Sequence, residues 1–227
     1  MEEQVAHKPF DISDLGRDEL TGLLKYGDFV GSMEQTMDRA VQTQESVSLG
    51  LIDIDWFGRI NDEHGSSTGD GVLKELAGFL RGRFTDQGSV FRYGGDAFAV
   101  LLEGTEKEQA FLLLEDARKG FDGPHTIPAA EGDVTLPLTV SAGLASYPDD
   151  GASPHELVRK ANGALYRAKV GERNRVCLAR EEKMVTKTSH YTQGQLHGLS
   201  RLAKREGIGE AVLLREALDD LLRKYNA

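Results

Sequence analysis

The sequence is poor in cysteine and has no long apolar run. Cys177 is the only cysteine among 227 residues, so no disulfide can form within one chain. No apolar stretch approaches the roughly 20 residues that cross a bilayer, and the residues after Met1 lack the basic start and apolar run of a signal peptide. We therefore expect a cytoplasmic protein with no membrane partner.

Charge is unevenly distributed along the chain. Hydrophobic residues make up 39% and charged residues 28%, as in ordinary soluble proteins, and the net charge is -10. Residues 183–227 contain eight Lys and Arg against five Asp and Glu, a net charge of +3, which leaves -13 for the rest of the chain. This asymmetry indicates two modules with different partners.

Strand-like and helix-like segments alternate over the first module. Residues 47–55 form a mostly apolar run that ends in two acids, which is typical of a buried central strand with carboxylates at its C-terminal edge. Residues 134–145 supply a further strand. The pattern predicts an α/β sandwich with a central mixed sheet and surrounding helices.

Three segments have helical spacing. Thr105 and Glu108 predict a capping box before one helix, and Ser153 with Glu156 repeats this signature, with Pro154 at the first helical position. The apolar positions that should face the core are Leu73, Leu76, Ala77 and Leu80 in the first segment, Ala110, Leu113, Leu114 and Ala117 in the second, and Leu157, Ala161, Leu165 and Ala168 in the third.

Polar residues gather at the ends of these elements. Residues 92–98, Arg-Tyr-Gly-Gly-Asp-Ala-Phe, lie between two apolar segments and predict a hairpin tip where the backbone can approach a phosphate. Asp96 at this tip and Asp53 at a strand end could share a divalent metal, while Lys169 and Arg173 could hold phosphates. Taken singly, each has an ordinary explanation as a cap, a turn or a solvated pair.

The order and spacing of these segments resemble the GGDEF family of diguanylate cyclases. The resemblance is carried by residues 18–23, 52–57, 60–62, 69–70, 92–98, 139–143 and 164–175, and extends from residue 18 to about 179. It implies a fold related to adenylyl cyclases and polymerase palms. It also implies an enzyme that joins two GTP molecules, one on each protomer of a dimer, into cyclic di-GMP.

The same resemblance assigns roles to individual residues. Asp53, the Ile54 carbonyl and Asp96 would bind the Mg²⁺ that accompanies GTP, and Asp96 would also activate the attacking 3'-hydroxyl. The remaining nucleotide-binding positions would be Asn61 and Asp70 for the guanine edge, Gly94 and Gly95 for backbone approach to the phosphates, and Lys169 and Arg173 for phosphate charge.

Ala97 departs from the family pattern, because it stands where the second carboxylate of the motif, a metal ligand, is expected. The loss of this carboxylate predicts weak or absent catalysis, so that Asp96 would have at most a residual catalytic role, with nucleotide binding retained. Natural drift and an engineered Glu→Ala change both explain it. Drift is favoured by further departures: Leu24-Lys25-Tyr26 where Asn-Arg is usual, Gly58 for Lys, and Ser66 for His.

A product-inhibition site is a further expectation from the resemblance. The family uses Arg-x-x-Asp ahead of the hairpin, and Arg83 and Asp86 have this internal spacing. Five residues rather than the usual three separate Asp86 from Arg92, so the pair would be displaced along the surface. The alternative is a solvated pair of charges.

The second module resembles the ribbon-helix-helix repressors. Residues 185–191 are β-prone, Thr192 and Gln195 form a capping box, and a second helix begins near Glu210. In that family two chains pair and their strands enter the DNA major groove. The resemblance places Thr186, Thr188 and His190 against DNA, and the alternative is a helical hairpin used only for dimerisation.

The sequence therefore predicts three segments: a lead-in over 1–17, a GGDEF-type nucleotide-binding domain over 18–179, and a ribbon-helix-helix domain over 180–227. We expect a homodimeric transcriptional regulator that binds duplex DNA and a guanine nucleotide, either GTP or cyclic di-GMP. One alternative is a diguanylate cyclase, impaired here by Ala97. The other is a dimeric scaffold that binds neither ligand.

Overall fold

The computed structural model describes residues 16–129, 132–179, 189–206 and 209–224. The chain divides into two compact units, residues 1–181 and 182–227, each of which is described by itself. Thr186 and Thr188 lie outside the described residues. In the part of the chain that is described, no helix is both long and apolar enough to cross a membrane.

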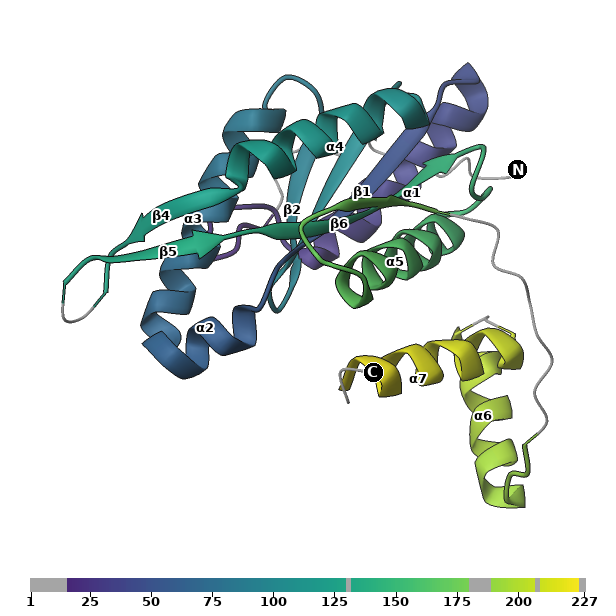
Figure 1. Cartoon of the computed structure of the whole chain (residues 1–227). Helices are drawn as coiled ribbons and strands as arrows, with labels where there is room; N and C mark the ends of the chain where they lie inside the picture. Colours follow the sequence, from purple (N-terminus) through teal and green to yellow (C-terminus); the bar gives the residue numbers. More distant parts are fainter. Residues whose placement is uncertain (1–15, 130–131, 180–188, 207–208, 225–227) are drawn as a thin grey trace. The chain divides into compact units, whose positions relative to one another are not determined.

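A five-stranded sheet organises the first unit, with the strand order β2-β3-β1-β6-β7 (Figure 1). Its central strand β1 pairs antiparallel with β3 and β6, whereas β7 runs parallel to β6. The predicted mixed sheet is thus confirmed. The strand bounds are β1 Val47–Ile54, β2 Ser89–Gly94, β3 Ala97–Glu103, β6 Val140–Tyr147 and β7 Val176–Leu178.

Helices cover both faces of this sheet because side chains along each strand alternate between the two faces. Ile52 and Val100 belong to one apolar cluster with residues of α3 and α4, and Leu51 and Leu101 belong to a second with residues of α1 and α5. The central strands β1 and β3 are therefore apolar on both faces. The helix bounds are α1 Tyr26–Thr43, α2 Phe57–His64, α3 Ser66–Phe84, α4 Lys107–Phe121 and α5 Pro154–Val170.

The two predicted helix starts of this unit differ in outcome. Ser153 caps α5 by accepting a hydrogen bond from the Glu156 N–H at 3.3 Å, with Pro154 in the first turn, as predicted. The capping box of Thr105 and Glu108 was wrong, since α4 begins one residue later with Glu106 as its N-cap. Thr105 is instead occupied elsewhere, because its hydroxyl donates to the Glu103 carbonyl and its own carbonyl accepts from Ser48 Oγ at 2.9 Å.

The single strand predicted over 134–145 was also wrong, because it is interrupted at Thr139. β5 (Val134–Leu138) pairs with β4 (Gly123–Ile127) in a separate two-stranded sheet, and β6 then joins the main sheet. Thr139 lies between β5 and β6 and is held by Asp55. The Thr139 carbonyl accepts a hydrogen bond from the Asp55 N–H at 3.0 Å, and the Thr139 hydroxyl donates to the Asp55 carboxylate at 2.8 Å.

The second unit contains α6 (Gln193–Glu206) and α7 (Glu210–Lys224). The predicted capping box is present, since the Thr192 N–H donates to Gln195 Oε1 at 2.9 Å and the Gln195 N–H donates to Thr192 Oγ1 at 3.2 Å. Within its described residues this unit has no strand, and most of the predicted ribbon lies outside them. The ribbon-helix-helix assignment therefore stays a prediction.

Candidate nucleotide site

Asp53 and Ala97 face each other across the β1–β3 pair, at the end of the sheet where the hairpin tip lies. The register pairs these two residues directly, so their side chains point to the same face of the sheet. α5 brings Lys169 to the same place, where its ammonium donates to Asp53 Oδ1 and, at 2.8 Å, to the Ile54 carbonyl. The structure thus joins three of the predicted site residues in direct contact.

Asp53 lies close to a second carboxyl group, that of Asp96, as well as to Lys169. Burial raises the pKa of Asp53 to about 7, and the neighbouring Asp96 adds to the rise while Lys169 opposes it. The Asp53 and Asp96 carboxyl groups and the Ile54 carbonyl supply hard oxygen donors, which suit Mg²⁺. Among the described residues, no three His, Cys, Asp or Glu side chains form a metal-binding group. The methyl group of Ala97 stands where the family resemblance expects another carboxylate.

The hairpin tip owes its shape to Gly94 and Gly95, whose φ angles are 147° and 54°. Residues other than glycine rarely adopt these backbone conformations, which explains why glycine occupies both positions. Both glycines are exposed, and apart from the adjacent residues of the chain no described protein atom lies within 4 Å of a Cβ built at either position. Space at the tip therefore remains for a ligand to approach the backbone.

Arg92 supports this tip, a role that the sequence interpretation missed. Its guanidinium lies 4.7 Å from the Phe98 ring centroid and donates to the Gly95 carbonyl. Burial lowers its pKa, although nearby carboxylates including Asp18 and Asp96 oppose the shift. The position of a basic residue two places before the glycines was the available signal.

Asn61 and Asp70, the predicted base-reading residues, lie on the consecutive helices α2 and α3. Asn61 Oδ1 is buried and has no hydrogen-bond partner among the described residues. Gly69 makes room for it, because a Cβ at that position would lie 1.9 Å from this oxygen. Asp70 is exposed. An unsatisfied buried acceptor beside an accessible carboxylate suits a ligand with several hydrogen-bond donors on one edge.

The loop after α5 is anchored by Asp55, another residue without a predicted role. Asp55 is 3% exposed, and its carboxylate accepts hydrogen bonds from Thr139 Oγ1, Ser141 Oγ and the Asn174 N–H at 2.7 to 3.0 Å. These contacts fix the backbone beside Arg173, whose guanidinium stacks on the Trp56 ring. In the sequence, the signal for this anchor was the second of the two acids that end the apolar run at 47–55.

The other predicted sites lie elsewhere. Arg83 forms an ion pair with Asp116 of α4, and Asp86 is exposed in the turn after α3. Arg83 thus pairs with a residue of α4, and the inhibitory site formed by Arg83 and Asp86 stays a prediction. His190 is exposed just before α6.

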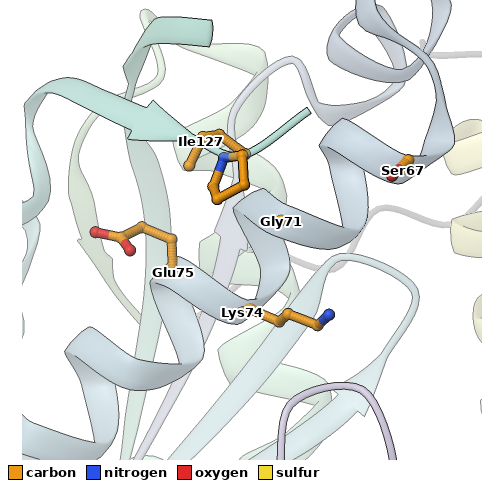
Figure 2. A pocket seen from close by; sticks show the side chains of 6 residues that line it. Ser67, Gly71, Lys74, Glu75 and Ile127 are labelled. Atoms are coloured by element: carbon orange, nitrogen blue, oxygen red, sulfur yellow. The ribbon is translucent and has the colours of Figure 1, made fainter. Parts of the chain in front are cut away.

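A cavity of about 320 Å³ lies between α3 and the end of β4 (Figure 2). Lys74 and Glu75 point in different directions there, and Glu75 contacts His125 at 3.1 Å. No predicted site residue lines this cavity, whose walls are formed by Ser67, Gly71, Lys74, Glu75, Ile127 and Pro128.

Comparison with known proteins identifies relatives of this chain. The curated relatives include the response regulator PleD of Caulobacter vibrioides, 35% identical over 160 residues that cover 70% of this chain and 35% of that protein. Diguanylate cyclase A of Treponema denticola is 33% identical over 159 residues, covering 69% of this chain and 42% of that protein. The chain therefore spans less than half the length of these relatives.

Solved structures share the fold. The GGDEF domain of PA1120 from Pseudomonas aeruginosa matches with a TM-score of 0.68 and 31% identity, covering 73% of this chain and 95% of that one. DgcB from Caulobacter crescentus, solved in complex with c-di-GMP, matches with a TM-score of 0.67 and 29% identity, covering 72% and 85%. The family model described as "Diguanylate cyclase, GGDEF domain" matches residues 16–175. The chain belongs to the GGDEF family of diguanylate cyclase domains.

Proposed function

We propose that residues 18–179 bind a guanine nucleotide with Mg²⁺ and that Ala97 leaves this diguanylate cyclase site impaired. The observation that carries the proposal is the direct pairing of Asp53 with Ala97. A carboxylate at position 97 would add a second charge beside Asp53, and a methyl group cannot bind a cation. The relatives favour this function over the DNA-binding regulator that we expected from the sequence.

Each residue would contribute a defined interaction. Asp53, the Ile54 carbonyl and Asp96 would hold Mg²⁺, which when bound neutralises phosphate charge. Asn61 and Asp70 would accept hydrogen bonds from the donors on the guanine edge. Gly94 and Gly95 would offer backbone N–H groups to the phosphates.

Lys169 and Asp96 have the roles closest to the chemistry. The Lys169 ammonium already lies on two of the proposed metal-binding oxygens, so it can neutralise charge there before ligands arrive. Lys169 and Arg173 would then balance the phosphate charge. Asp96 would accept the proton of an attacking 3'-hydroxyl, and a second copy of the chain would present the second nucleotide.

Calorimetry of the full chain tests this function, with GTP, ATP and cyclic di-GMP in turn, each with and without Mg²⁺. We expect Mg²⁺-dependent GTP binding that is tighter than ATP binding, and little cyclic di-GMP formation. Steady turnover of GTP by this sequence would refute the impairment. Absence of binding by both guanine nucleotides would refute the function.

We also propose that residues 180–227 pair with a second copy and bind duplex DNA through Thr186, Thr188 and His190. The net charge of +3 over residues 183–227 favours contact with phosphates, and large apolar side chains are available for pairing. Leu196, Leu202, Leu218 and Leu221 are 36 to 54% exposed within this unit. A unit of this size cannot bury a sufficient core alone, which supports a partner chain.

The test compares the full chain with a His190→Ala variant on genomic DNA fragments over a range of salt concentrations. We expect affinity that falls steeply with salt and weakens in the variant. His155→Ala is the matched control, because His155 is exposed on α5 in the other unit. A dimer without salt-sensitive DNA affinity would support the dimerisation-only alternative instead.

A further inference from the structure

Trp56 and Arg173 form a stack beside the candidate site. The Arg173 guanidinium carbon lies 3.6 Å from the centroid of the Trp56 ring, well inside the roughly 6 Å range of a cation–π contact. Trp56 is the only tryptophan of the chain, and it is 59% exposed. This large apolar ring thus lies outside the core, where it covers the face of a cation.

Both partners of the stack have unusual backbone conformations. Their φ angles are 60° at Trp56 and 56° at Arg173, in the left-handed region that residues other than glycine seldom adopt. Such conformations persist where the surroundings fix them. Here the Arg173 N–H donates to the Ala168 carbonyl at 3.1 Å, and the next N–H, of Asn174, donates to buried Asp55. The backbone on the Arg173 side is therefore held firmly.

The stack leaves the hydrogen-bond donors of Arg173 unused. A ring that covers the face of a guanidinium uses none of its N–H groups, since these point outward in the guanidinium plane. Arg173 Nε is buried and has no hydrogen-bond partner among the described residues. By contrast, the Lys169 ammonium is engaged by Asp53 and the Ile54 carbonyl. Arg173 is thus oriented by a contact that preserves its capacity to bind an anion.

We propose that Trp56 is a positioning residue whose ring holds the Arg173 guanidinium ready for the terminal phosphates of the nucleotide. This inference rests on the proposed nucleotide function and adds a residue to that site. It implies that an aromatic ring at position 56 strengthens the phosphate-dependent part of the affinity and leaves recognition of the base unchanged.

Calorimetry of the full chain with GTP and with GMP, both with Mg²⁺, separates these two parts. Trp56→Ala should weaken GTP binding about 2- to 12-fold, the range expected when one long side chain must be ordered on binding, with GMP binding unchanged. Trp56→Phe should retain most of the GTP affinity. In Arg173→Ala, the additional Trp56→Ala change should have no further effect on GTP binding, because the two residues act through one contact.

Fluorescence supplies a measurement that needs no nucleotide. Because Trp56 is the only tryptophan, Arg173→Ala should change the emission spectrum of the free protein. Leu112→Ala is the control, since Leu112 is 66% exposed on α4 and its removal should alter neither the spectrum nor GTP binding. An unchanged spectrum in Arg173→Ala would overturn the stack.

The binding outcomes distinguish this inference from the function on which it rests. GTP affinity of Trp56→Ala equal to that of the unaltered chain would overturn the role of Trp56 and leave the nucleotide function intact. Equal losses for GTP and GMP would also overturn it, because they would indicate a general structural effect. If the unaltered chain binds no guanine nucleotide, both the function and the role of Trp56 are refuted.

Discussion

Lys169 of α5 reaches across to the end of β1, where its ammonium bonds both the Asp53 carboxylate and the Ile54 carbonyl. These residues are 116 and 115 positions apart in the sequence. The same two oxygen-bearing groups are those proposed to bind Mg²⁺. The Lys169 ammonium thus offsets negative charge at the partly buried Asp53 carboxyl group.

Ala97→Glu should increase Mg²⁺-dependent turnover of GTP, on the order of 100-fold over any background, because it adds a carboxylate opposite Asp53. Product formation is measured by chromatography of the nucleotides. Ala97→Gln is the matched control, as it has nearly the same shape without the charge. Equal gains in both variants would show that charge is not the missing feature. No gain in either would locate the defect elsewhere in the site.

Asp70→Ala should weaken GTP binding about 10-fold or more while ATP binding changes little, because guanine donors would lose their acceptor. Competition titrations with both nucleotides measure this preference. Asp62→Ala serves as a control, since Asp62 is an exposed acid on the neighbouring helix α2. If GTP and ATP bind equally well to the unaltered protein, Asp70 and Asn61 do not select the base.

Gly143→Ala should destabilise the fold by about 3 kcal/mol, because there is no space between β6 and α5 at this position. A Cβ there would lie 2.1 Å from the Ala161 carbonyl oxygen and 2.2 Å from the Leu165 nitrogen, both backbone atoms. Gly78→Ala in α3 is the contrasting change, as nothing lies within 4 Å of its Cβ. It should stabilise the helix by up to about 1 kcal/mol. Thermal unfolding of both variants measures these changes in stability. A Gly143→Ala variant as stable as the unaltered protein would contradict the close packing of β6 on α5.

Stability should fall on acidification partly through Glu115. Burial pushes its pKa upward, but hydrogen bonds from Arg118 and from the Val176 N–H outweigh burial and lower the pKa. A group whose pKa is lowered by folding stabilises the protein above its unfolded pKa, and this stabilisation is lost as the pH falls through the folded pKa.

Glu115→Gln should therefore be less stable than the unaltered protein at pH 7, with a smaller loss of stability below about pH 4.3, the ordinary glutamate pKa. Denaturant unfolding at a series of pH values measures both effects. Glu34→Gln, which changes an exposed glutamate in the middle of α1, is the control. Identical pH profiles for Glu115→Gln and the unaltered protein would contradict the role of Glu115.

Much of the fold could be read from local sequence patterns. The apolar run at 47–55 specified a buried strand, and Ser153 with Pro154 specified the start of α5, because burial periodicity and capping act over a few neighbouring residues. The family resemblance likewise assigned Asp53, Asp96 and Lys169 to the candidate site, since each occupies a fixed place in a motif. The missing carboxylate at Ala97 is evident from the residue type alone.

Other features depended on contacts between distant segments. Thr105, the expected cap of α4, is bonded through its carbonyl by the distant Ser48, and the strand over 134–145 was interrupted where Thr139 binds Asp55. The pairing of Asp53 with Ala97, the stack of Arg173 on Trp56 and the anchor at Asp55 join residues 44 to 119 positions apart. Periodicity and capping rules describe only neighbours along the chain. The sequence by itself determined which chemical groups the site contains, and tertiary packing decided which of them meet.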